Sequence, residues 1–109
     1  MTRILEIRTY RLKENSRNEF HRLVVEQSLP LLKSAGTDVV TFGPSLDETN
    51  AYFLARAYDS VEELRASQDA FYSSDAWRQG PREAIVGLIK STTGAAFELS
   101  EEAIEAMRR

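Results

Sequence analysis

The chain has 109 residues, of which 42% are hydrophobic and 28% charged. Its net charge of −3 and pI near 5.2 argue against a general nucleic-acid binder, which would carry a basic face. The absence of cysteine excludes disulfides, thiolate zinc sites and cysteine nucleophiles. No apolar run approaches the ~18 residues of a membrane span, and no signal-peptide core is present. We therefore expect one soluble, cytoplasmic domain.

Residues 4–13, ILEIRTYRLK, alternate as a β-strand does. Two different faces result: the first carries Leu5, Ile7 and Thr9, and the second carries Glu6, Arg8 and Tyr10. We expect helices to cover the first face. The second face mixes charges with apolar groups and needs a cover of its own.

A helix follows this strand, and the pair Ser16 and Glu19 has the spacing of a capping box. The helix carries an apolar stripe made of Phe20, Leu23, Val24 and Leu31. Pro30 lacks an amide hydrogen, so it predicts a kink over residues 26–30, and Gly36 predicts the end of the helix.

Two strands joined by a polar turn come next, over residues 38–46 and 51–58, and predict a hairpin. The second strand, AYFLARAY, alternates small and large residues. Its alanines suit close packing against helices, whereas its large residues need another partner: Tyr52, Leu54, Arg56 and Tyr58.

Ser60 and Glu63 form a second capping box, which begins a helix that turns Val61, Leu64 and Phe71 inward. A break at residues 73–75, a short turn with Trp77 and a helix over 81–86 complete this region. Residues 89–99 predict a last strand that Gly94 weakens in its middle. Residues 100–109, SEEAIEAMRR, predict an amphipathic tail helix with acids first and arginines last.

The predicted order is β-α-β-β-α-β, the ferredoxin-like pattern with an antiparallel sheet and an α+β architecture. Helices cover one face of such a sheet. A second copy of the same sheet is the simplest cover for the other face, so we expect a homodimer formed through the sheet.

Several segments together resemble the NIPSNAP family of the dimeric α+β barrel superfamily: ILEIRTYRLK, LPLLKSAG, ETNAYFLARAYDSVEEL and SSDAW. The resemblance covers residues 3–99, and we assign residues 1–99 to a NIPSNAP-like domain and 100–109 to the tail helix. It implies a ferredoxin-like protomer, a homodimer and a cavity between two sheets. Relatives often carry a His and a Trp where this chain has Leu54 and Arg56, so a His-based mechanism is not carried over.

A candidate pocket lies around Glu6, Arg8 and Tyr10, because alternate strand residues stand about 7 Å apart on one face. Arg56 should lie on the same face, and Arg offers a planar fork that can hold a carboxylate or enolate. Tyr10 can donate a hydrogen bond, or act as an acid if a neighbour lowers its pKa. The alternative is that Glu6 only neutralises the two arginines at a dimer interface.

The predicted ligand-binding residues are Arg8, Tyr10, Leu54, Arg56 and Trp77, and the candidates for catalysis are Tyr10, Arg56 and Glu6. Two functions follow from this pocket. The first is binding of a small apolar or anionic molecule, and the second is a small cofactor-independent enzyme of the monooxygenase, isomerase or cyclase type, which rests on analogy of fold.

His21 is the single histidine, and it lies off the apolar stripe of its helix. It is the sole candidate for a haem ligand or general base, against the simpler interpretation of a helix-surface residue. Trp77 can be a lid over a cavity mouth or an anchor for packing. We expect no metal and no cofactor, because the chain has one His, no Cys and no glycine-rich phosphate loop.

Overall fold

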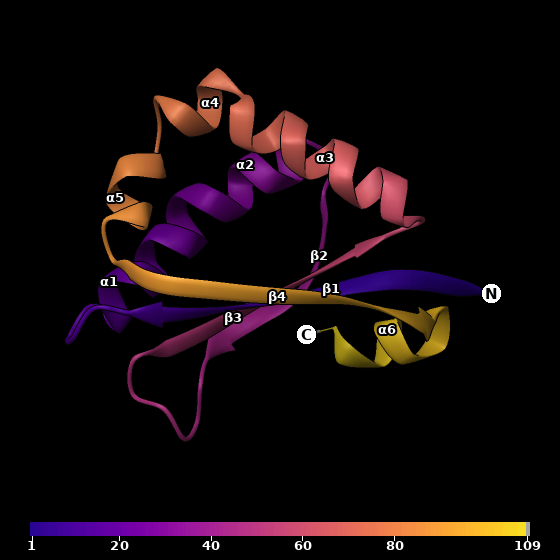
Figure 1. Ribbon diagram of the computed structural model, residues 1–109, viewed down its shortest axis with the longest axis horizontal. Coiled ribbons are helices and arrows are strands. Elements are labelled where there is room, and N and C mark those ends of the chain that lie inside the picture. The colour runs from indigo at the N-terminus through magenta and orange to yellow at the C-terminus, as the bar shows by residue number, and fades with distance from the viewer. Residues whose placement is uncertain (109) are drawn as a thin grey trace.

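The computed structural model describes residues 1–108 and confirms the predicted order of elements (Figure 1). The elements are β1 (Thr2–Leu12), α1 (Arg17–Leu23), the π-helix η1 (Val24–Ser28), α2 (Leu29–Ser34), β2 (Asp38–Pro44), β3 (Ala51–Tyr58), α3 (Val61–Ser73), α4 (Asp75–Arg78), α5 (Arg82–Val86), β4 (Ile89–Ser100) and α6 (Glu101–Met107). The four strands form one antiparallel sheet in the order β2-β3-β1-β4. This is the ferredoxin-like arrangement that the sequence predicts.

The helices cover the opposite face of the sheet from the one predicted. Helices α1 to α5 lie over the face that carries Glu6, Arg8 and Tyr10, which we call the cleft face, and α6 lies below the other, outer face (Figure 1). The large residues of β3 turn toward the helices, because Tyr52 and Leu54 join the main core there. The alternation was correct, but the side that the helices cover was not.

The main core fills the space between the cleft face and the helices. Ten buried residues form it: Leu12, Phe20, Leu23, Val24, Leu32, Tyr52, Leu54, Phe71, Trp77 and Ile85. Removal of this apolar surface from water is the principal force that holds the helices on the sheet. A smaller core on the outer face joins Leu5, Val40, Ala55, Ala57 and Ile104.

The first helical region changes from α-helix to π-helix just before Pro30, in the segment where the sequence predicts a kink. The chain passes from α1 into the π-helix Val24–Ser28 and then into α2, whose first turn contains Pro30. The Leu29 amide donates to the Val24 carbonyl five residues earlier, as in a π-helical turn, and Pro30 has no amide hydrogen to donate. Gly36 ends the region with a φ of 82°, as predicted.

The two predicted capping boxes have different outcomes. The Ser60 hydroxyl accepts a hydrogen bond from the Glu63 amide at 3.0 Å, as predicted. The Ser16 hydroxyl makes no such cap and donates instead to the Lys13 carbonyl, so that prediction was wrong. Val61 is also 38% exposed instead of turned inward.

The tail forms the helix α6, which packs on the outer face. Ser100 caps it by accepting a hydrogen bond from the Ala103 amide, and Ile104 is fully buried under the sheet. Arg108 binds Asp38 of β2 with two hydrogen bonds of 2.7 and 2.8 Å. Residue 109, the last position of the predicted tail helix, lies outside the described residues. Within residues 1–108, none of the helices has the length and apolarity to cross a membrane.

Candidate functional site

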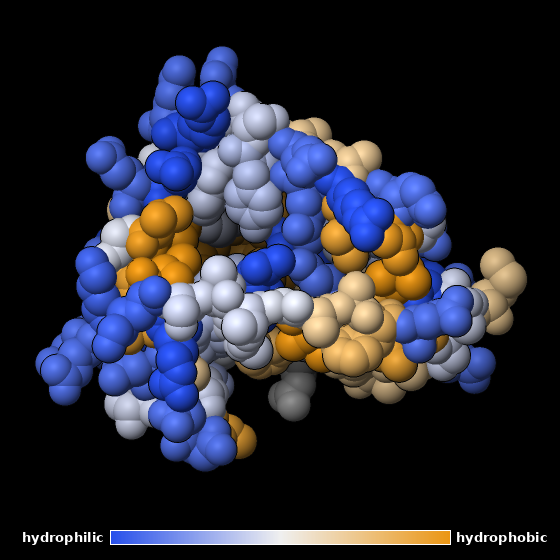
Figure 2. Space-filling model, viewed as in Figure 1, coloured by the Kyte–Doolittle hydropathy of each residue, from blue (hydrophilic) through white to orange (hydrophobic). Residues whose placement is uncertain are grey.

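A cleft of about 480 Å³ opens between the cleft face of β1 and β4 and the helices α3 to α5. Figure 2 shows it as a hollow above β4 with apolar surface at its floor. The residues that line it are Arg8, Tyr10, Gln68, Tyr72, Trp77, Arg82, Ile85, Val86, Ile89 and Thr92. Its volume falls in the range of roughly 300–1,000 Å³ that is typical of small-molecule sites.

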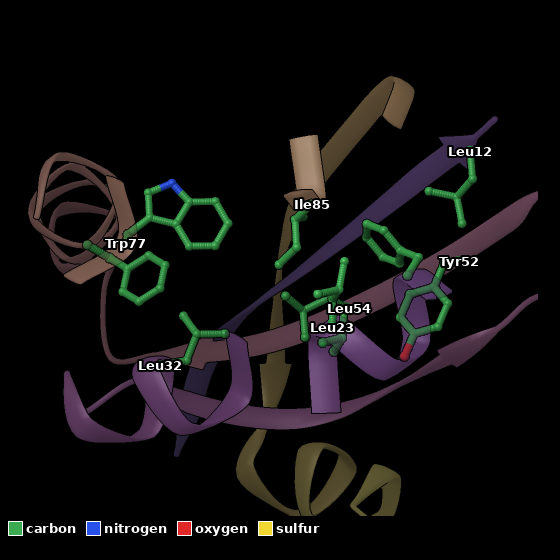
Figure 3. Packing of buried hydrophobic residues seen from close by; sticks show 10 residues of the cluster. Leu12, Leu23, Leu32, Tyr52, Leu54, Trp77 and Ile85 are labelled. Atoms are coloured by element: carbon green, nitrogen blue, oxygen red, sulfur yellow. The ribbon is translucent and has the colours of Figure 1, made fainter. Parts of the chain in front are cut away.

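A small inner cavity of about 40 Å³ lies next to the cleft. The two spaces share four wall residues: Tyr10, Tyr72, Trp77 and Ile85. The remaining walls of the inner cavity come from the main core, including Leu54 (Figure 3), and from Ser28. The site therefore has a polar outer part and an almost entirely apolar inner part.

Small side chains on β4 make room for the cleft. The residues of β4 that pair with Tyr10, Arg8 and Glu6 of β1 are Thr92, Gly94 and Ala96. Cross-strand partners project from the same face of a sheet. Because the β4 partners are small, the cleft face is left open under α5 and the large side chains of β1 form its wall.

A buried ion pair lies at one end of the cleft. Glu6 and Arg56 are cross-strand partners, with exposed fractions of 3% and 1%, and Arg56 Nε donates to Glu6 Oε1 at 3.0 Å. Arg8 Nη2 donates to the other carboxylate oxygen at 3.0 Å, and Arg56 Nη1 donates to the Tyr72 hydroxyl at 2.9 Å. Arg56 Nη2 lies 2.8 Å from Glu6 Oε1 but makes no hydrogen bond, so this contact is ionic only.

The ionisation states of this cluster follow from burial and charge. Burial acts to raise the pKa of Glu6, but the charge of Arg56 and hydrogen bonds from Gln68, Arg8 and Arg56 outweigh it and hold the pKa below its ordinary value. Burial raises the pKa of Tyr10, and the nearby Tyr72 adds to this. The charges of Arg56 and Arg8 act to lower the pKa of Tyr10, but burial outweighs them, so the phenol stays protonated and can donate a hydrogen bond, the first of the two roles considered for it.

The structure brings most of the predicted site residues together. Arg8, Tyr10 and Trp77 line the cleft, and Leu54 lines the inner cavity. Glu6 and Arg56 are buried beside the cleft and hold Arg8 and Tyr72 in place. All six lie between the sheet and the helices of one protomer, so the expected placement between two sheets was wrong.

Sequence analysis missed four polar residues of the cleft, namely Gln68, Tyr72, Arg82 and Thr92. Gln68 and Tyr72 stand four residues apart on α3, so they share a helix face. This spacing, beside the predicted inward residue Phe71, is the sequence signal that could have identified Gln68 and Tyr72 as cleft residues. Nothing in the local sequence of Arg82 marks it as a cleft residue.

Trp77 is both an anchor and a wall of the site. Its side chain is 7% exposed and contacts the rings of Phe71 and Tyr72 at centroid distances of 5.4 and 5.5 Å. In Figure 3 its indole extends toward Ile85. The two interpretations of Trp77 from sequence are therefore compatible, because a packed indole also closes one side of the cavity.

His21 lies outside the cleft on the exposed side of α1. Its Nδ1 atom lies 2.6 Å from the hydroxyl of Tyr52, which is 1% exposed. Local sequence patterns do not reveal this partner of His21, because Tyr52 is 31 residues away and on another element. Within residues 1–108, no three His, Cys, Asp or Glu side chains gather in a way that could hold a metal ion.

Comparison with known proteins places this fold in a family. The NIPSNAP family model matches residues 5–101. A NIPSNAP family protein of unknown function from Agrobacterium tumefaciens superimposes with a TM-score of 0.81 at 20% identity, over 90% of this chain and 88% of that one. An uncharacterised NIPSNAP domain protein from Burkholderia xenovorans gives 0.76 at 19% identity, over 86% and 91%.

A more distant likeness extends beyond these proteins. A protein from Nitrosomonas europaea, provisionally assigned as an antibiotic-biosynthesis monooxygenase, superimposes with a TM-score of 0.63 at 16% identity, over 86% of this chain and 95% of that one. At this identity the likeness is one of fold. No curated protein matches the sequence. Since the family model spans nearly all of the ferredoxin-like core, the chain belongs to the NIPSNAP family.

Proposed function

We propose that this protein binds a small molecule with an apolar body and an anionic group in the cleft between its sheet and helices. The apolar body lies toward the inner cavity, and the anionic group meets Arg8. One observation carries the proposal: a cleft whose charged lining residues are arginines adjoins an apolar cavity, and the two spaces share the walls Tyr10, Tyr72, Trp77 and Ile85.

The charges of the cleft favour an anion. Although the chain has a net charge of −3, the charged residues among those that line the cleft are Arg8 and Arg82, and none of the described lining residues is Asp or Glu. Arg8 uses Nη2 to bind Glu6, and its side chain is still 28% exposed. The guanidinium therefore keeps donors free for a carboxylate, whose geometry matches that of the Arg fork.

The same residues support binding more than turnover. A proton-transfer reaction needs a group with a pKa near the working pH within reach of the ligand. Tyr10 keeps its proton, Glu6 is already bound to two arginines, and His21 lies outside the cleft. We therefore place the cofactor-independent enzyme second, because its support is a likeness of fold to the Nitrosomonas protein.

A pair of matched probes tests this proposal. Calorimetry should detect binding of decanoate and weaker binding of decanol, because only the carboxylate can bind Arg8. Arg8→Gln should weaken decanoate binding about tenfold and leave decanol unchanged, which is the loss of one partly exposed charge-assisted bond. The exposed Arg65 provides the control Arg65→Gln.

Trp77 is the single tryptophan, so a change in its emission on binding reports that the ligand occupies the cleft. Equal affinity of the wild type and Arg8→Gln for decanoate would contradict an anion site at Arg8. Binding without any change in Trp77 emission would place the ligand elsewhere.

We also propose a homodimer, formed through the outer face of the sheet as in a dimeric α+β barrel. The support is the apolar surface that α6 leaves uncovered there, where Phe97 is 50% exposed and Ile7 and Phe53 are partly buried. Native mass spectrometry should show a dimer, and Phe97→Glu should convert it to a monomer. The exposed loop residue Leu46 provides the control Leu46→Glu, which should leave the dimer intact.

A further inference from the structure

Gly94 of β4 lies directly opposite Arg8 of β1 in the sheet. We propose that Gly94 is a positioning residue, whose missing side chain lets the Arg8 guanidinium lie flat against β4 with its free N–H groups directed into the cleft. The inference rests on the proposed function, because anion binding is what gives Arg8 its task.

The geometry of this contact admits a Cβ atom at position 94 only if the Arg8 guanidinium shifts by a few tenths of an ångström. A Cβ atom at position 94 would stand 3.1 Å from both Cζ and Nη2 of Arg8 and 3.4 Å from Nε. Carbon atoms attract one another best at about 3.5–4.0 Å, so these approaches are too close. Three atoms of one planar group at nearly the same distance indicate that the guanidinium faces Gly94 with its flat side.

Arg8 cannot simply move aside to admit a side chain. Its Nη2 donates to Glu6 Oε2 at 3.0 Å, and Glu6 is itself held by the buried Arg56. A shift of the guanidinium would stretch this bond to a carboxylate that is buried and needs its partners. The position of Arg8 is therefore fixed from two sides, by Glu6 at one end and by the β4 backbone beneath it.

The backbone itself does not require glycine at this position. Positive φ values occur at Gly36 and Gly43, whereas β4 pairs with β1 in regular register through Gly94, and the register shift lies at Arg11 and Leu12. Glycine weakens a strand interior and often marks a place where another group approaches the backbone closely. Here that group is the Arg8 side chain.

The test uses two variants of increasing size, Gly94→Ala and Gly94→Val. Decanoate affinity should fall about threefold for Ala and about tenfold for Val, because one charge-assisted bond is progressively misaligned. Decanol affinity should stay within about twofold, and the melting temperature should change little, because the better strand propensity of alanine and valine offsets the strain on the Arg8–Glu6 bond. A purely structural role of Gly94 would instead lower the melting temperature and both affinities.

A double mutant and a ligand-free measurement complete the test. In the Arg8→Gln background, Gly94→Val should have no further effect on decanoate binding if it acts through Arg8. In ligand-free NMR spectra, Gly94→Val should shift the Arg8 Nε–H signal and leave the buried Arg56 Nε–H signal in place.

The two measurements separate this inference from the proposed function. An unchanged Arg8 Nε–H signal in Gly94→Val would overturn the positioning role whether or not decanoate binds. If the signal shifts but the wild type does not bind decanoate, Gly94 still positions Arg8 and the proposed function fails. A Gly94→Val effect on decanoate that persists in the Arg8→Gln background would also overturn the inference.

Discussion

Removal of the Arg56 charge is the perturbation that tests the buried cluster most directly. Arg56→Met keeps an unbranched side chain but leaves Glu6 buried with Arg8 as its remaining ion-pair partner. Loss of one partner of a buried pair costs about 3–5 kcal/mol. Because Arg8 still holds one carboxylate oxygen, we expect a loss at the lower end of this range, about 3 kcal/mol of unfolding free energy. This loss corresponds to a decrease in melting temperature of roughly 12 °C.

The effect of Arg56→Met should depend on pH in a definite direction. In the native protein the pKa of Glu6 is below its ordinary value, so Glu6 contributes stability above that ordinary pKa, and the contribution is lost as pH falls through the lower, folded-state pKa. Without Arg56, burial should raise the pKa of Glu6 instead. Protonation of Glu6 therefore stabilises the variant relative to the wild type. The difference in unfolding free energy between the two proteins should be smaller at pH 4 than at pH 7.

Urea unfolding measured by circular dichroism, at one fixed protomer concentration, provides the free energies. In the Arg56→Met background, Glu6→Gln should restore part of the stability at pH 7, since it removes the uncompensated charge. Arg65→Met controls for the loss of an exposed arginine. A loss below 1 kcal/mol, or a loss of equal size at both pH values, would refute the buried-charge argument.

Three further predictions concern other parts of the fold. Gly36→Ala should cost about 1 kcal/mol in unfolding free energy, because Gly36 has a φ of 82°, and Gly36→Asn should cost less. His21→Ala should cost about 1–2 kcal/mol by leaving the buried Tyr52 hydroxyl without its partner, and Tyr52→Phe should recover stability in that background. Asp38→Asn should speed amide exchange in α6, because it breaks the contacts with Arg108.

Asp38 should also contribute to the decrease in unfolding free energy at acid pH. A hydrogen bond from Arg108 is the main cause that lowers the pKa of Asp38 to about 2. Its contribution is present above the ordinary pKa of Asp and is lost as pH falls toward 2, so Asp38→Asn should flatten the decline in this range. Unchanged amide exchange in α6 would contradict the role of the Asp38–Arg108 contacts. Equal costs of Gly36→Ala and Gly36→Asn would contradict the backbone argument at Gly36, and no recovery of stability by Tyr52→Phe would contradict the His21–Tyr52 hydrogen bond.

Local sequence patterns were sufficient to predict the elements and their order. The alternation in residues 4–13, the cap at Ser60 and the helix end at Gly36 each depend on a few neighbouring residues of the chain. Such signals do not depend on what packs against them. Alternation also predicted that Arg56 lies on the same face of the sheet as Glu6, and the strand register makes the two residues direct cross-strand partners.

The tertiary structure alone decided which face of the sheet the helices cover, and with it the location of the site. Alternation divides a strand into two faces but does not say which one is buried, and both faces here carry apolar groups. Glu6 and Arg56 neutralise each other, so the part of the cleft face that carries them can be buried with Tyr52 and Leu54. The contacts of Arg8 with Gly94 and of His21 with Tyr52 join residues far apart in sequence, and only the packed fold brings such pairs together.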